Sequence, residues 1–322
     1  MNTGRRPGLA ALATLVASSR PARAGAWPER PVRLVVPYAP GGANDILARL
    51  YGQRLGETFG QPFVVENRPG AQAIIGAALV ARAVPDGHTL LLGASGPLVF
   101  NPAGYARLPY DPQTDFAPVS LLAAYPLAVV VPAAGPFRTL QDLLAFARIH
   151  PDSVTYGAGA TSIQLPTELL NQRAGTRFQY VAYRGSAETV QAVAQGEVTM
   201  ALVDAGPATL GHAAGRIRIL AVTAPRRLPA WPECPTMGEL DFPDLTIELW
   251  SGLLAPAATP PGIVARLAVA AAGITREASM RQRLLALSLQ PLGSTPEQFR
   301  GIIAAELPLW AEVARKSGLR LG

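Results

Sequence analysis

The residues best suited to hold an anion follow the first predicted strand. Residues 34–36 form a continuous apolar run, which is typical of a strand buried on both faces. Pro40, Gly41 and Gly42 then predict a turn, and a helical pattern begins at Asn44 or Asp45. A helix start at the carboxyl end of a strand offers free N–H groups and about half a positive charge. The stretch therefore predicts an anion-binding corner, although such turns also occur without a ligand.

Nucleotide binding and catalysis are not favoured. The glycines match neither G-x-G-x-x-G nor the P-loop pattern. Ser95 lies in G-A-S-G-P, where Pro97 replaces the second glycine of a nucleophile elbow. Cys234 is the only cysteine, the three histidines are scattered, and Lys316 is the only lysine. We therefore expect no enzyme activity, no cofactor and no metal site.

Length and composition predict two domains, and the N-terminal pattern predicts export. The chain has 322 residues, of which 49% are hydrophobic and 16% charged, so it can bury a large core. The N-terminus has Arg5 and Arg6, then an apolar stretch at residues 9–17, then an A-x-A site at residues 22–24 or 24–26. This pattern predicts a signal peptide at residues 1–24, cleaved near Ala24. The arginine pair suits twin-arginine export and is also compatible with the general secretory route.

The basic charge belongs partly to this leader. The whole chain has 28 basic and 22 acidic residues, a net charge of +6. Removing residues 1–24 removes four arginines and no acid, which leaves 24 against 22 and a net charge of +2. A nucleic-acid partner is therefore not expected. No apolar run of the mature chain approaches the roughly 20 residues that span a membrane.

Alternating strand and helix patterns predict an α/β fold with a mainly parallel sheet, whose ligands lie at the carboxyl ends of the strands. Strands are predicted at residues 62–67, 89–92, 127–131, 154–156, 178–181, 199–203, 217–222 and 249–254. Helices are predicted at residues 74–83 and 139–150. Three further helices are predicted: one that runs through residues 169–170, one that ends at residue 195, and one that begins at residue 295. Residues 93–97 predict a second glycine turn, and residues 111–122, which are proline-rich and then apolar, predict a crossing segment.

Helix ends carry clear signals. Thr139 can cap the helix that follows it, and Gly196 suits a C-cap. Residues 295–298, T-P-E-Q, form a capping box with proline at the first helical position. Pro308 should kink or split the last helix, because an interior proline costs about 3 kcal/mol.

Several longer motifs occur in a fixed order. They are W-P-E-R-P-V-R-L-V-V-P-Y-A-P-G-G-A-N-D-I-L-A-R, V-V-E-N-R-P-G-A, P-D-G-H-T-L-L-L-G, L-P-Y-D-P-Q-T-D-F-A-P-V-S, Y-R-G-S-A, G-L-L-A-P and P-P-G-I-V-A-R-L. Together they span the chain from Trp27 to the C-terminus and resemble the Bug family. These proteins are the periplasmic solute-binding receptors of tripartite tricarboxylate transporters.

The resemblance implies a type II periplasmic-binding-protein fold, the Venus flytrap, with a central ligand cleft. Lobe 1 would comprise residues 27–122 and 226–322, and lobe 2 residues 123–225. The implied function is capture of a small carboxylate, or a related organic acid or amide, for membrane permease subunits by a monomeric receptor. A periplasmic sensor that feeds a signalling system is the alternative.

By position, the family's binding loops correspond to residues from both lobes. In lobe 1 these are Tyr38, Gly41, Gly42, Asn44, Asp45, Ala94, Ser95 and Gly96. In lobe 2 they are Gly159, Thr161, Ser162, Gln164, Tyr183, Arg184, Gly185, Ser186 and Asp204. The resemblance implies that backbone N–H groups, hydroxyls and ordered waters hold the carboxylate.

The departures from the family pattern all lie in lobe 2. Gln164 replaces a usual histidine, Arg184 a usual lysine, and Ala205 a usual asparagine. Ligand identity is therefore the least transferable inference. Asp204 ends an apolar strand, where an unpaired acid is costly, so it should orient an amine or amide ligand or pair with an arginine.

Several of the candidates also have structural explanations. Asp45 could only complement the helix dipole, and Arg184 could be a solvated surface residue. Tyr183 could be a core residue whose hydroxyl is satisfied locally. The glycines of the turns could serve only chain reversal.

Overall fold

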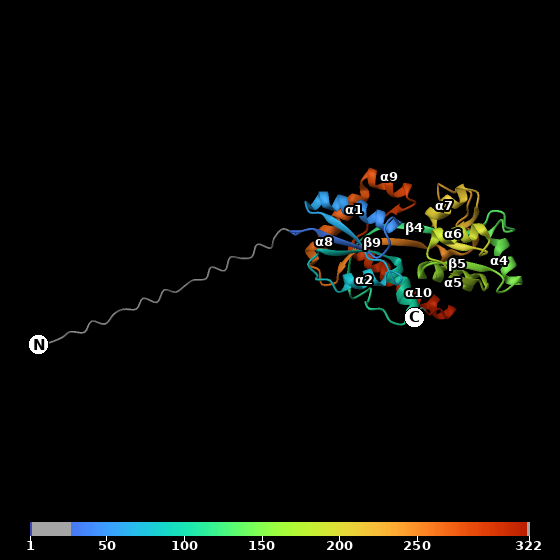
Figure 1. Cartoon of the computed structure of the whole chain (residues 1–322), viewed down its shortest axis with the longest axis horizontal. Coiled ribbons are helices and arrows are strands. Elements are labelled where there is room, and N and C mark those ends of the chain that lie inside the picture. Colours follow the sequence, from blue (N-terminus) through green and yellow to red (C-terminus); the bar gives the residue numbers. More distant parts are fainter. Residues whose placement is uncertain (2–26, 321–322) are drawn as a thin grey trace.

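The computed structural model describes residue 1 and residues 27–320. The predicted signal peptide and its cleavage site lie outside the described residues, apart from Met1. The described chain forms two α/β lobes side by side, joined by the strands β4 (Phe116–Pro132) and β9 (Glu248–Pro256) (Figure 1).

Lobe 1 is built on a six-stranded sheet in the order β10-β4-β9-β3-β1-β2. Its remaining strands are β1 (Val32–Val36), β2 (Phe63–Asn67), β3 (Thr89–Ala94) and β10 (Gln290–Pro291). β1 pairs in parallel with β2 and β3, whereas β9 runs antiparallel to β3 and β4. The predicted mainly parallel sheet is therefore wrong: the sheet is mixed, because one strand leaves lobe 1 and another returns beside it.

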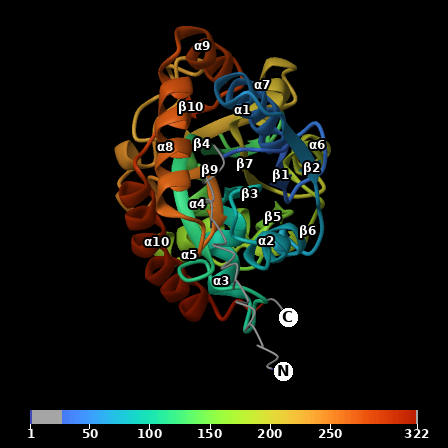
Figure 2. The same ribbon diagram turned by 90° about the vertical axis from the view of Figure 1, so that its left-hand side faces the viewer.

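Helices cover both faces of this sheet, which explains the continuous apolar run of β1. Leu34 and Val36 face a core shared with α1 (Ala43–Phe59), α8 (Pro261–Arg276) and α9 (Ala278–Ala286). Val35 faces a second core with α2 (Ile74–Ala81) and α10 (Pro296–Ser317). Figure 2 shows the strands lying between α1 and α2.

Lobe 2 is arranged around the second half of β4. β7 (Ala201–Asp204) and β8 (Ile217–Val222) pair with it in antiparallel orientation. β5 (Thr155–Ala158) and β6 (Gln179–Ala182) pair in parallel, and a bridge between Tyr156 and Met200 links β5 to β7. The helices are α4 (Leu140–Ile149), α5 (Thr161–Ala174), α6 (Ser186–Gln195) and α7 (Ala205–Ala213).

Two predicted segments differ from the structure. Residues 116–122 of the predicted crossing segment (111–122) and the predicted strand at 127–131 belong to one continuous 17-residue strand, β4, whereas residues 111–115 precede it. Its pairing with β9 shifts register next to Pro118, where a bulge accommodates the missing N–H. The predicted turn at 93–97 is also wrong, because β3 passes into a π-helix, η1 (Gly96–Phe100), and then α3 (Asn101–Gly104). Gly93 serves packing instead: a Cβ there would lie 2.6 Å from Leu254 Cδ1.

The helix-end predictions are confirmed. Thr139 and Thr295 each form a capping box, and Gly196 ends α6 with a left-handed φ of 75°. Pro308 does not split α10, which runs unbroken from Pro296 to Ser317. Both Pro308 and Ala304, whose carbonyl loses its helical partner, are exposed, so water can satisfy that carbonyl.

Candidate ligand-binding cleft

A cavity of about 1010 Å³ lies between the two lobes. It is bounded by the carboxyl ends of β1 and β3 on one side and of β5, β6 and β7 on the other. The helices α1, α5, α6 and α7 all begin at this cavity. Their starts direct partial positive charge into it from both lobes.

The backbone N–H groups of these helix starts lack capping side chains. Within the described residues, no side chain caps α1, α5, α6 or α7, whose N-cap residues are Gly42, Ala160, Gly185 and Asp204. The first N–H groups of a helix need an acceptor from elsewhere. A ligand carboxylate in the cavity can supply that acceptor.

Asp45 stabilises the turn before α1 without lining the cavity. Its carboxylate accepts hydrogen bonds from the Gly41 backbone N–H at 2.9 Å, from Arg49 Nε at 2.9 Å and from Asn67 Nδ2 at 2.9 Å. The Arg49 guanidinium lowers the pKa of Asp45 to about 2. Asp45 is 3% exposed and is not among the residues that line the cavity. Its role is therefore to hold the turn in shape.

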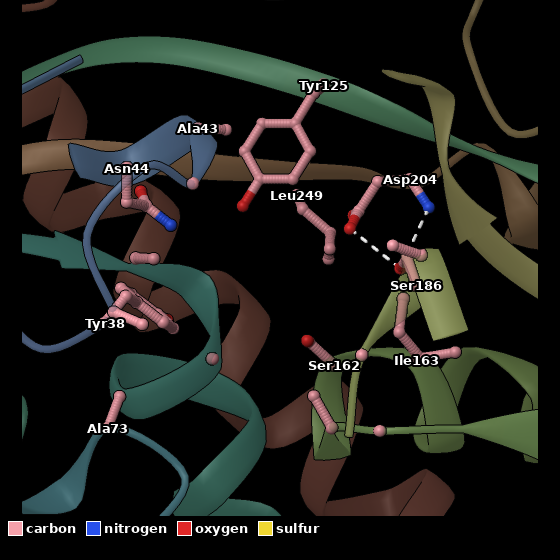
Figure 3. A pocket seen from close by; sticks show the side chains of 18 of the residues that line it. Tyr38, Ala43, Asn44, Ala73, Tyr125, Ser162, Ile163, Ser186, Asp204 and Leu249 are labelled. Carbon is pink, nitrogen blue, oxygen red and sulfur yellow. Dashed lines mark hydrogen bonds between the residues drawn. The ribbon is translucent and has the colours of Figure 1, made fainter. Parts of the chain in front are cut away.

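Hydroxyl and amide groups form the lobe 1 wall. Ser251 Oγ donates to Asn44 Oδ1 at 2.5 Å, and Trp250 N–H donates to Ser95 Oγ at 3.4 Å. Burial raises the pKa of both Tyr38 and Tyr125, so these hydroxyls stay protonated and can donate. Figure 3 shows Tyr38 and Asn44 across the cavity from Ser162, Ser186 and Asp204, with the Tyr125 hydroxyl directed toward the Asn44 side.

Two loops form the lobe 2 wall and pack closely on each other. A Cβ on Gly159 would lie 2.5 Å from the Gly185 nitrogen, so only glycine allows this approach. Ser186 Oγ donates to Asp204 Oδ2 at 2.8 Å, as Figure 3 shows. Burial raises the pKa of Asp204, and the Ser186 hydrogen bond partly offsets that rise.

The structure brings most of the predicted site residues together. Thirteen of the seventeen line the cavity: Tyr38, Gly42, Asn44, Ala94, Ser95, Gly96, Gly159, Thr161, Ser162, Arg184, Gly185, Ser186 and Asp204. Gly41, Asp45, Gln164 and Tyr183 do not line it. The Tyr183 hydroxyl instead donates to Glu197 Oε2 at 3.4 Å.

Sequence reasoning missed several lining residues. They include Gln72, Ala73, Asn101, Tyr125, Ile163, Leu249 and Leu289. Tyr125 and Leu249 lie within apolar strands and resemble core residues in sequence. Gln72 follows the R-P-G turn, which was a detectable signal for a loop at the cleft.

The described residues contain no cluster of metal-ligating side chains. Among them, no group of three or more histidine, cysteine, aspartate or glutamate side chains could hold a metal ion. Burial raises the pKa of Cys234 to about 11, so little thiolate forms at neutral pH. No helix in the described part of the chain is long and apolar enough to cross a membrane.

Two lobes joined by crossing strands, with helix starts from both directed into one cleft, define a solute-binding protein of the Venus flytrap type. Residues 47–319 match the model of the tripartite tricarboxylate transporter family receptor. The chain belongs to this family, whose members are periplasmic receptors. The resemblance to the Bug family is confirmed.

Individual relatives agree with this assignment. Protein BugT of Bordetella pertussis is 34% identical over 305 residues, which cover 94% of this chain and 93% of BugT. The structure of R. palustris Rpa4515 with adipate has a TM-score of 0.83 and 35% identity, and covers 91% of this chain and 99% of that one. MatC from Rhodopseudomonas palustris with bound malate has a TM-score of 0.79 and 30% identity, with 89% and 99% covered.

Proposed function

We propose that this receptor captures a small organic acid between its lobes in the periplasm and presents it to the permease subunits of a tripartite tricarboxylate transporter. The observation that carries the proposal is the convergence of four uncapped helix starts on one cleft. The adipate and malate of the two solved relatives support a carboxylate ligand.

The charge of the cleft favours binding by dipoles and hydroxyls. Arg184 is the one arginine among the cavity-lining residues of the described chain, and it is exposed. A bidentate clamp for the carboxylate is therefore not expected from the side chains that line the cleft. N–H groups of the helix starts and protonated tyrosines are the donors that remain.

We further propose that ligand binding stabilises a closed arrangement of two lobes, residues 27–122 plus 226–322 and residues 123–225. The boundary at 122/123 falls inside β4, and the boundary at 225/226 falls between β8 and β9. Because β4 and β9 run from one lobe to the other (Figure 1), bending of these strands can change the cleft width. One chain forms both walls of the cleft, so we propose that the receptor is a monomer.

Thermal unfolding with a library of small carboxylates tests this function. Ligand at 100 times its Kd should raise the unfolding free energy by about 2.7 kcal/mol. Diols of the same length, which lack the carboxylate, are the matched controls and should leave the melting temperature unchanged. The ligand should be recovered chemically intact after incubation. No shift with any acid or amide would contradict the proposal, and turnover of a bound acid would indicate an enzyme.

A further inference from the structure

Of the two acids that line the cleft from lobe 2, Asp204 and Glu188, Asp204 is the less exposed. Asp204 is the last residue of β7 and the N-cap residue of α7, and it lines the cavity beside Ser186 (Figure 3). Its Oδ2 accepts the Ser186 hydroxyl, and its backbone N–H donates to the same Ser186 Oγ at 3.4 Å. A carboxylate can accept about four hydrogen bonds, so Asp204 keeps acceptor capacity for a ligand.

No cation of the described chain pairs with this acid. Asp204 takes part in none of the ion pairs found among residues 27–320. The other charged residues of the lining are Arg184 and Glu188, both exposed, and Glu188 Oε2 accepts the Arg184 backbone N–H at 2.8 Å. The alternative that Asp204 pairs with an arginine therefore has no support in this structure.

The two walls of the cleft differ in charge. The lobe 1 wall contributes no acid to the lining, and its polar groups include Asn44 and the Tyr38 hydroxyl, next to which Tyr125 lies on the crossing strand β4. That wall suits a carboxylate. The lobe 2 wall presents the carboxyl group of Asp204 at the start of α7, with no cation paired to it, and burial raises the pKa of this group. A ligand carboxylate beside Asp204 would add a second carboxyl group.

We propose that Asp204 selects ligands that carry a hydrogen-bond donor, an ammonium or a primary amide, at the end opposite to their carboxylate. This inference rests on the proposed function and narrows the ligand class from organic acids to amino acids and acid amides. An ammonium supplies the missing counter-charge, and an amide N–H fills the free acceptor positions. A dicarboxylate can bind in the same place only with an additional proton or with its second carboxylate turned away.

Length-matched ligands test the proposal by titration calorimetry at pH 7. For the six-carbon series the probes are 6-aminohexanoate, the monoamide of adipic acid, adipate and hexanoate, and the four- and five-carbon series are built in the same way. The purified receptor should bind the amino or amide member of its preferred length at least tenfold more tightly than the corresponding dicarboxylate. Asp204→Asn should weaken binding of the amino acid at least tenfold and strengthen binding of the dicarboxylate.

A matched control and a second readout keep the test decisive. Asp152→Asn removes an exposed acid that is paired with Arg177 outside the cleft, and it should leave the ranking of ligands unchanged. The ranking for the unmodified receptor is informative by itself if Asp204→Asn fails to fold. A dicarboxylate that binds more tightly than its amino and amide counterparts would overturn the role of Asp204 and leave the proposed function intact. Failure of every acid to bind would overturn both.

Discussion

At the scale of single residues, the cleft depends on groups that shape it as much as on groups that face it. Asp45 shows this most clearly, since its carboxylate joins the Gly41 backbone, Arg49 and Asn67 and yet does not line the cavity. The turn that precedes α1 is therefore held from behind. Its free N–H groups keep their direction because Asp45 restrains the backbone between Gly41 and Asn44.

Asp45→Ala should both destabilise the protein and weaken ligand binding. Loss of a buried hydrogen-bonded acid leaves the Gly41 N–H without this acceptor and Asn67 Nδ2 with only the Tyr38 carbonyl, and we expect the unfolding free energy to fall by about 1–3 kcal/mol. Urea denaturation measures this loss, and calorimetry measures the weaker binding. The control Asp152→Asn removes an exposed ion pair and suits the left-handed backbone at this position, so it should cost less than about 1 kcal/mol. Equal stability of Asp45→Ala and the unmodified receptor would show that the hydrogen bonds of Asp45 do not stabilise the fold.

The sequence predicts part of this arrangement. Gly42 and Asn44 were placed at the cleft because the strand, turn and helix signals of this stretch are local. The spacing of Asp45 and Arg49 by one helical turn was also visible. Asn67 lies 22 residues further on, and its contact with Asp45 depends on the pairing of β1 with β2. Tyr125 gave no signal, because a tyrosine within an apolar strand is usually a core residue.

At the scale of the elements, the contrast between β8 and β4 shows what local patterns determine. β8 has the predicted bounds, residues 217–222, since Arg218 is the one polar residue in its apolar run. β4 contains prolines that suggested a break, and only its pairing with β7, β8 and β9 makes it continuous. Pairing over long sequence distances therefore decides the crossing strands, which are the part of the fold that joins the lobes.

The contact between α10 and β9 should make stability depend on pH. Trp250 Nε1 donates to both carboxylate oxygens of Glu306, at 3.1 and 3.0 Å. Burial raises the pKa of Glu306 from about 4.5 to about 7, despite the opposing effect of that hydrogen bond. The folded protein therefore binds a proton more tightly than the unfolded chain. The contribution of Glu306 to the unfolding free energy should be greatest below about pH 4.5. It should fall by up to about 3 kcal/mol as the pH rises to about 7.

Urea denaturation between pH 5 and pH 8 measures this dependence. Glu306→Gln should reduce the slope, because the substituted side chain does not titrate. The control Glu312→Gln lies on the same helix, where Arg315 lowers the pKa of Glu312 to about 2, so its titration falls outside the measured range. A slope that is identical in the unmodified receptor and in Glu306→Gln would refute the assignment.

At the scale of the whole molecule, the cleft arises because chain segments far apart in sequence end at the same place. The lobe 1 wall is formed by the ends of β1 and β3, the lobe 2 wall by the starts of α5, α6 and α7, and Tyr125 of the crossing strand β4 lies between them. Sequence reasoning placed the strand ends correctly in the cavity through their glycine and serine content. It could not give the distance between the walls or the contacts that cross from one lobe to the other.

Gln72 makes one of these crossing contacts. Its side-chain Nε2 donates to the Gly159 carbonyl at 3.5 Å, which links the loop before α2 to the loop before α5. The backbone at this point is constrained, because Ala71, Gln72 and Ala73 all have positive φ, of 46°, 54° and 70°. Asn101 Nδ2 holds the segment by donating to the Gln72 carbonyl at 2.8 Å. A left-handed non-glycine residue costs about 1–2 kcal/mol, so the fold keeps Gln72 in place against local preference.

Removing the Gln72 amide should therefore favour the open cleft. We expect Gln72→Ala to weaken ligand binding by about two- to fivefold, the worth of one exposed hydrogen bond, through faster dissociation at an unchanged association rate. Gln72→Gly removes the same amide, so it should weaken binding by the same factor. Because glycine suits the positive φ, the unfolding free energy of Gln72→Gly should lie up to about 1 kcal/mol above that of Gln72→Ala. Stopped-flow binding and urea denaturation separate the two effects, with Gln53→Ala on the exposed face of α1 as the control. Unchanged dissociation rates in both Gln72 variants would show that the lobes close without this contact.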